Sequence, residues 1–245
     1  FKAVPDSQDV QVASDRTLDF SKAKLTISEY DKNAIEAGAR VAAASGGETV
    51  AVTVGGSDID NSKLKKDVLA RGMDRLVMLA DDALAGLDAA ATASALAGAL
   101  SKAGDVDLVL CGDGSADDYA QQVDVQLAAR LGVPVVNGAT RIAAKGGALE
   151  VERTLEDVVE TVEVPLPAVV SVAPDIAEPR IPGMKDILAA GKKPMNVAAA
   201  DASFDAKVEV VSCQAPEQAE RKLEIMDASE DGAIERFAAA LKAAL

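Results

Sequence analysis

The chain has 245 residues, of which 49% are apolar and 2% aromatic, and its 25 basic and 40 acidic residues give a net charge of -15. This length is enough to bury a sizeable core in one large or two small domains. The acidic balance excludes charge-driven binding of nucleic acid or of an anionic membrane. The absence of histidine excludes Ser-His-Asp and Cys-His triads and histidine metal sites.

Cysteine usage and hydropathy restrict the class of protein further. Cys111 and Cys213 are too few for a disulfide framework or a cysteine-rich zinc site. No apolar run approaches the ~20 residues of a membrane span, and no signal peptide is recognisable. We therefore expect a cytoplasmic protein without direct membrane insertion. Because the chain begins at Phe1 rather than at methionine, we also expect a few residues to precede it in the full protein.

The first 135 residues alternate short apolar runs with helical patterns. Strands are predicted over 48–54, 76–79, 107–111 and 133–136. Short continuous apolar runs are typical of a parallel sheet that is covered on both faces. The alternation predicts a doubly wound α/β fold with a mostly parallel, Rossmann-like sheet.

The starts of four helices in this region are indicated by capping residues. Two starts have the S-x-x-D form of a capping box, and two are single Asn or Asp caps. The expected starts are Ser28, Asn61, Asp88 and Ser115, and the second and third helices are expected to end at Gly72 and Gly104.

From about residue 139 the pattern changes to strands joined by short turns. We expect strands over 140–144, 149–155, 158–164 and 168–172, with Gly146-Gly147 as a hairpin turn. They are predicted to form an antiparallel extension of the same sheet. A loop with two prolines and a glycine follows at 178–184, before a short helix near 185–190.

The last segment, 201–245, is predicted to be an arm that ends in a helix over 232–245. Ile234, Phe237, Leu241 and Leu245 fall on one face of that helix. Such an amphipathic helix packs either on another subunit or on its own domain, and the sequence leaves both readings open.

The strongest signal for a binding site is the segment 111–122, CGDGSADDYAQQ, which follows a strand and opens the helix predicted from Ser115. Ligands of open α/β sheets sit at the carboxyl ends of strands, and free N–H groups at a helix start attract phosphate. Gln121 and Gln122 are expected in the first turns, where their amides could donate to phosphate. No basic side chain lies in the segment, which suits a diphosphate better than a triphosphate with Mg²⁺. The alternative is an ordinary βα turn.

Three other features have competing interpretations. Cys111 is either a reactive thiol or a small buried residue. The pair Asp117-Asp118 is either catalytic or a charge at a helix start. A basic patch of Arg180, Lys185 and Lys192-Lys193 is either a docking surface or a solvated face.

The motifs at 1–6, 27–36, 111–122, 134–138 and 178–185 together resemble the beta subunit of electron-transfer flavoprotein. The similarity runs in order over nearly the whole chain. It points in particular to the Fix-type branch, which includes proteins associated with anaerobic carnitine reduction.

This resemblance implies an electron-transfer subunit rather than an enzyme with catalytic residues of its own. The family forms an alpha–beta heterodimer whose alpha subunit carries the FAD that exchanges electrons with an acyl-CoA dehydrogenase or a quinone oxidoreductase. The beta subunit binds AMP or, in electron-bifurcating members, a second FAD that takes a hydride from NADH. Of the two, FAD is the favoured expectation here. Residues 1–200 would form the nucleotide-binding domain, including a recognition loop at 178–193, and 201–245 would pack on the alpha subunit.

The resemblance also implies which residues bind and dock. The cofactor-binding residues would be Ala3, Val4, Ser28, Asp31, Thr53, Val54, Gly55, Cys111, Gly112, Asp113, Gly114, Ser115, Asp118, Ala120, Gln121, Gln122, Val123 and Asn137. The docking residues would be Ile181, Met184 and Ile187. Two alternatives to this function are a nucleotide-sensing module without electron transfer and a hydrolase that uses Asp117 or Asp118.

Overall fold

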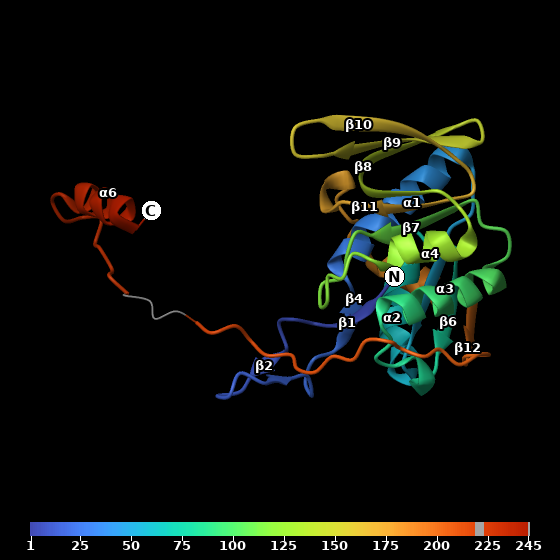
Figure 1. The fold of residues 1–245 in the computed structure, drawn as a ribbon, viewed down its shortest axis with the longest axis horizontal. Coiled ribbons are helices and arrows are strands. Elements are labelled where there is room, and N and C mark those ends of the chain that lie inside the picture. Colours follow the sequence, from blue (N-terminus) through green and yellow to red (C-terminus); the bar gives the residue numbers. More distant parts are fainter. Residues whose placement is uncertain (219–222, 245) are drawn as a thin grey trace.

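A computed structural model describes residues 1–218 and 223–244 and contains helices on both sides of a central sheet (Figure 1). The helices are α1 (Glu29–Ser45), α2 (Ser62–Ala70), α3 (Ala89–Ala103), α4 (Val123–Leu131), α5 (Met184–Ala190) and α6 (Ala233–Ala244). The strands are β1 (Ala3–Pro5), β2 (Gln11–Val12), β3 (Leu18–Asp19), β4 (Leu25–Ile27), β5 (Val50–Gly55), β6 (Arg75–Ala80), β7 (Leu108–Gly112), β8 (Val135–Lys145), β9 (Ala148–Thr154), β10 (Val159–Pro165), β11 (Ala168–Val172) and β12 (Met195–Ala198).

The strands of the central sheet fall into two groups. One group has the order β12-β6-β5 and is parallel throughout. The other has the order β10-β9-β8-β11-β7, in which β8, β11 and β7 are parallel and β9 and β10 are antiparallel. The prediction of a doubly wound, mostly parallel sheet is confirmed.

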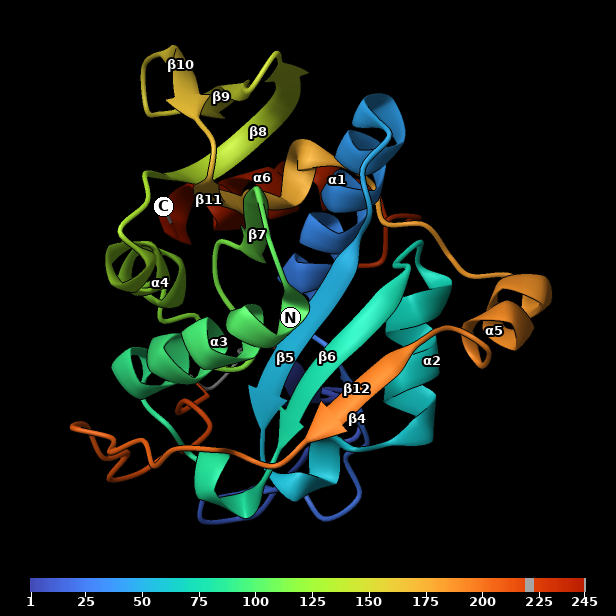
Figure 2. The same ribbon diagram turned by 90° about the vertical axis from the view of Figure 1, so that its right-hand side faces the viewer.

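Alternate residues of β6 are buried on opposite faces of the sheet, each against a different set of helices. Leu76 and Met78 of β6 pack with α1 and α2, whereas Val77 and Leu79 pack with α3. Both α1 and α3 span the two groups of strands, because each contributes to hydrophobic clusters on either side. The two groups are therefore held together by shared helices (Figure 2).

Two expectations about the later strands were wrong. Of the predicted runs 133–136 and 140–144, residues 135–136 and 140–144 belong to one strand, β8, which continues into the β9 hairpin at Gly146-Gly147. The run 168–172 is not part of an antiparallel extension, because β11 lies between β7 and β8 and is parallel to both. Pairing between strands so far apart in the chain leaves no local signal in the sequence.

Two predicted caps are confirmed by their hydrogen bonds. The Asn61 side chain accepts from the Lys63 and Leu64 N–H groups at the start of α2. The Asp88 side chain accepts from the Ala91 N–H at the start of α3, which ends at Gly104 as expected.

The helix start predicted at Ser115 was wrong. Tyr119 and Gln121 have positive φ angles of 47° and 54°, which a right-handed helix does not allow. The helix instead begins at Val123, with Gln122 as its N-cap. Residues 113–122 therefore form a loop, and Gln121 and Gln122 precede the helix rather than lying in its first turns.

The arm after residue 200 leaves the α/β body, and α6 lies away from it in Figure 1. Ile234, Phe237 and Leu241 are exposed on α6, and the predicted fourth member of that face, Leu245, lies outside the described residues. In the described ranges, no helix is both long and apolar enough to cross a membrane.

The loop before α5 is tied to α1 through the buried carboxylate of Glu36. Arg180 donates to it through Nε at 2.6 Å, and Arg40 donates at 2.8 Å. Burial alone raises the pKa of Glu36, but hydrogen bonds from Arg180 and Arg40 and the charge of Arg180 outweigh it, so the pKa lies below its ordinary value. The ion pair thus fixes where the loop leaves the body.

Replacing this carboxylate tests its contribution to stability. We expect Glu36→Gln to lower the free energy of unfolding at pH 7 by about 1–2 kcal/mol. This value is below that of a fully buried ion pair, because Arg180 is half-exposed and solvent screens its charge. A lowered folded-state pKa gives stability that is present above the ordinary carboxyl pKa and lost as the pH falls through the folded value. Urea unfolding should therefore show the difference shrinking below about pH 4.

The matched control is Glu29→Gln, which removes an ion pair with Lys32 on the same helix whose carboxylate is 70% exposed. It should change the free energy of unfolding by less than about 0.5 kcal/mol. Equal stability of Glu36→Gln and wild type at pH 7 would contradict a stabilising role for the ion pair between Glu36 and Arg180.

Candidate functional site

The loop 113–122 at the end of β7 is held against the start of α1 and the N-terminal strand. The two carboxylate oxygens of Asp31 accept the N–H groups of Lys2 at 2.8 Å and Gly112 at 3.1 Å. Ser28 is the N-cap of α1, but its hydroxyl accepts the Ala116 N–H at 3.1 Å instead of capping the helix. The S-x-x-D motif at Ser28 therefore joins three segments, and the capping-box contacts expected of it are not made.

A lysine that the sequence analysis did not assign lies over this loop. The Lys2 ammonium is 2.8 Å from Asp117 Oδ1 and 3.4 Å from Ser115 Oγ. Burial alone raises the pKa of Asp117, but hydrogen bonds from Lys2 and Ser115 outweigh it and the pKa is lowered. The loop thus has a positive charge beside it that comes from a distant part of the chain.

The two tyrosines of the chain meet at the same loop. The rings of Tyr30 and Tyr119 are 5.1 Å apart and inclined by 43°, and the Tyr119 hydroxyl donates to Asp113 Oδ2 at 3.1 Å. A Cβ on Gly114 would overlap the Tyr119 ring, and one on Gly112 would come within 2.8 Å of the Tyr30 backbone. Both glycines are therefore needed for this packing. The sequence analysis missed the aromatic pair because its members are 89 positions apart in sequence.

A cavity of about 170 Å³ opens beside the loop. Asp113, Gln121 and Asn137 line it, together with Arg153, which donates to Asn137 Oδ1 at 2.9 Å. The buried pair Ser171–Asp124, with oxygens 2.5 Å apart, lines the cavity too. The expected proximity of Asn137 to the loop is thus present, while Arg153, Asp124 and Ser171 were missed because they lie on other elements.

Two buried polar atoms of the described residues have no hydrogen-bond partner within the protein. They are Thr53 Oγ1 on β5 and Asp113 Oδ1 after β7. Burial raises the pKa of Asp113, which favours its protonated, donor form. Hydroxyl and carboxyl groups of this kind can donate or accept hydrogen bonds, and Lys2 and the loop amides can bind an anionic group.

The remaining predicted site residues lie on β1, on β5, in the loop and at the start of α4. Ala3 and Val4 are on β1, which pairs antiparallel with β4. Thr53, Val54 and Gly55 are on β5, and a Cβ on Gly55 would contact Ile59. Asp118 and Ala120 are in the loop, and Gln122 and Val123 are at the start of α4. Contacts in the structure join Ser28, Asp31, Gly112, Asp113, Ser115, Gln121 and Asn137 into one region.

The predicted docking residues are exposed around α5. Ile181 is 93% and Met184 74% exposed, and Ile187 is 40% exposed. Leu188, which was not predicted, is also exposed on this helix. Apolar side chains exposed in a group are typical of a protein interaction surface.

Cys111 lies on β7, and burial raises the pKa of its thiol to about 12. At pH 8 only about one thiol in ten thousand would be ionised, and the thiolate is the reactive form. Cys213 is exposed.

We expect iodoacetamide at pH 8 to alkylate Cys213 at least about 100-fold faster than Cys111, as measured by peptide mass spectrometry. Comparable rates would contradict the interpretation of Cys111 as an inert, partly buried residue, and Cys213→Ser provides the control for assignment.

A comparison with protein families adds an independent finding. The family model described as electron transfer flavoprotein domain matches residues 16–203. The matched segment contains the loop 113–122, the cavity beside it and the exposed residues around α5.

Proposed function

Because this chain belongs to the electron transfer flavoprotein domain family and has a role in electron transfer, we propose that it is the beta subunit of a heterodimeric electron-transfer flavoprotein, of the Fix-type branch. The observation that carries the proposal is the loop 113–122, bound to Lys2 and to the start of α1 by Asp31 and Ser28.

This loop is proposed to hold an adenine nucleotide, with FAD favoured over AMP. Phosphate would be bound by loop amides and by Lys2, whose ammonium already reaches Ser115. A bound flavin supplies the chemistry of one- and two-electron transfer. The chain's own residues would position the nucleotide and keep it apart from water: the Tyr30–Tyr119 pair lies against the loop, and Asp113 has one buried oxygen free to bond a ligand.

Asn137 and the cavity it lines would lie nearer the isoalloxazine ring if the nucleotide is FAD. The cavity is continuous with the loop, because Asp113 and Gln121 belong to both. Arg153 donates to Asn137 and fixes the orientation of its amide. If this chain binds FAD, NADH would be the hydride donor and the complex would bifurcate electrons.

The arm 201–245 is proposed to pack on the alpha subunit and the segment 178–193 to form a recognition loop for an acyl-CoA dehydrogenase or a quinone oxidoreductase. Ile234, Phe237 and Leu241 are exposed on α6, which supports the first assignment. The exposure of Ile181 and Met184 supports the second. Residues 1–200 would then be the nucleotide-binding domain, and the complex would act in the cytoplasm.

The nucleotide content of the complex tests the assignment. We expect the chain, co-expressed with its alpha subunit and denatured after purification, to release adenine nucleotide in addition to the alpha subunit's FAD. Gly112→Ala should reduce this additional nucleotide at least about fivefold, since overpacking against Tyr30 costs about 1 kcal/mol or more. Chromatography of the released nucleotides measures both.

The matched control is Gly98→Ala on α3, where an added Cβ meets no atom within 4 Å. It should leave the nucleotide content unchanged. Two FAD per heterodimer would support a flavin in this chain, and one FAD with one AMP would support a structural nucleotide. Release of no additional nucleotide would overturn the proposed site and favour a different role for the loop.

A second prediction concerns docking. Met184→Ala removes an exposed apolar side chain and should slow electron delivery to an acyl-CoA dehydrogenase roughly tenfold without changing nucleotide content. Stopped-flow absorbance of the flavin measures the rate. The control, Val12→Ala on β2, removes an exposed apolar side chain outside the segment 178–193. It should leave the rate of electron delivery unchanged. A rate unchanged by Met184→Ala would rule out the docking role.

A further inference from the structure

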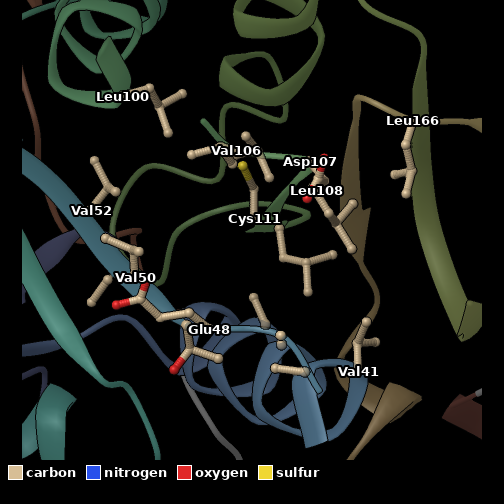
Figure 3. A pocket seen from close by; sticks show the side chains of 18 of the residues that line it. Val41, Glu48, Val50, Val52, Leu100, Val106, Asp107, Leu108, Cys111 and Leu166 are labelled. Atoms are coloured by element: carbon tan, nitrogen blue, oxygen red, sulfur yellow. The ribbon is translucent and has the colours of Figure 1, made fainter. Parts of the chain in front are cut away.

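Two cavities of the structure differ in the chemistry of their walls. The larger, of about 650 Å³, lies between β5 and β7 and is lined mainly by apolar side chains such as Val50, Val52 and Leu108 (Figure 3). The cavity of about 170 Å³ beside the loop has mainly polar residues in its wall. Among these is Asn137, the only asparagine of the chain that directly precedes a glycine.

Asn137 and Gly138 lie at a bulge in β8. The pairing of β8 with β11 shifts its register between Val170 and Val172, and the pairing of β8 with β9 runs from Ala139 onward. In the part of the chain that the structure describes, neither Asn137 nor Gly138 has a Cα partner on these two strands. Gly138 has a φ angle of 66°, a backbone conformation that favours glycine. The bulge therefore favours glycine directly after Asn137.

This pair is open to water and has room to react. Asn137 is exposed, and a Cβ built on Gly138 would meet no described atom within 4 Å. When the main-chain nitrogen after an asparagine bonds to the side-chain carbonyl carbon, a succinimide ring forms. A side chain on the following residue hinders this approach, and glycine has none. The ring can therefore form at Asn137 without displacing a neighbour.

The guanidinium of Arg153 holds the amide of Asn137 in one orientation. Arg153 donates through Nη1 to Asn137 Oδ1 at 2.9 Å and through Nε to Glu160 Oε2 at 2.5 Å. Because a guanidinium only donates, Oδ1 faces it and Nδ2 points away from it. A charged donor on a carbonyl oxygen stabilises the oxyanion that forms when a nucleophile adds to the carbon. Arg153 therefore activates the Asn137 Cγ atom toward attack.

We propose that Asn137-Gly138 is a site of self-catalysed deamidation that Arg153 assists. The Gly138 nitrogen gives its proton to hydroxide and bonds to Cγ of Asn137. The bond between Cγ and Nδ2 breaks, and this nitrogen takes a proton from water and leaves as ammonia. Water then opens the succinimide. Hydrolysis at Cγ gives aspartate, and hydrolysis at the main-chain carbonyl gives isoaspartate, in which the chain runs through Cβ.

Both products place a carboxylate where a neutral amide stood in the wall of the small cavity. Asp113 and Asp124 already line this cavity, and Arg153 is the basic residue that lines it. The reaction therefore changes the charge of the candidate site as the protein ages. The chemistry of the reaction does not depend on the proposed function.

Incubation of the folded, full chain at pH 8 measures the reaction. Peptide mass spectrometry follows the replacement of NH₂ by OH at each asparagine, and cleavage by hydroxylamine detects the succinimide. We expect Asn137 to convert at least about tenfold faster than Asn196. Asn196 is a matched control in the same chain, because it is also exposed but pairs with Val77 in the β12–β6 ladder and precedes the β-branched Val197.

A variant of Arg153 tests its part in the reaction. Arg153→Met removes the charged donor and should slow the conversion of Asn137 at least about threefold in the folded protein. In urea, where the fold no longer holds Arg153 against Asn137, wild type and variant should convert at the same rate. Asn137→Gln confirms the assignment of the signal, because the longer side chain does not form the succinimide.

Conversion of Asn137 no faster than that of Asn196 would overturn the proposed site. An unchanged or faster rate in folded Arg153→Met would overturn the assistance by Arg153, as would an equal slowing in urea. These readouts record mass and cleavage at single residues and do not involve a nucleotide. Their failure is therefore distinct from failure of the proposed function, which is measured by the nucleotides that the complex releases.

Discussion

The carboxylate of Asp31 joins the parts of the chain on which the candidate site depends. It is buried in the first turn of α1, and each oxygen accepts one backbone N–H, from Lys2 on one side and from Gly112 on the other. Both hydrogen bonds are partly buried, and a hydrogen bond to a charged group contributes about 1.5–3 kcal/mol. The N-terminal segment, the start of α1 and the end of β7 are therefore fixed together, and the position of Lys2 over the loop follows from this.

The elements that the sequence predicts correctly are those set by short-range chemistry. Asn61 and Asp88 cap helices with their own neighbours, so a local motif is enough to find them. Ser28 also precedes a helix, but its hydroxyl bonds to Ala116, 88 positions away. The strand 168–172 was recognised as a strand, yet its place between β7 and β8 depends on partners that no local pattern records.

The same distinction applies to the candidate site. The glycine-rich loop after β7 can be found from its composition, because glycine and small polar residues after an apolar run indicate a turn at a strand end. The helix expected to start at Ser115 could not be ruled out from spacing alone, since nothing in the local pattern indicates the positive φ angles of Tyr119 and Gln121. Lys2 and Arg153 enter the site from distant elements, so their roles required the fold.

The contacts that build the site also set an order in which it can form during synthesis. Asp31 and Gly112 are 81 positions apart, Lys2 and Asp117 are 115 apart, and Glu36 and Arg180 are 144 apart. At about 5–20 residues per second, Asp31 waits on the order of ten seconds for its second donor. On the ribosome, β5 and β6 can therefore pair before the loop 113–122 exists, and the segment around α5 is anchored last. A nascent chain would thus complete the candidate site before the segment with the exposed apolar side chains is fixed in place.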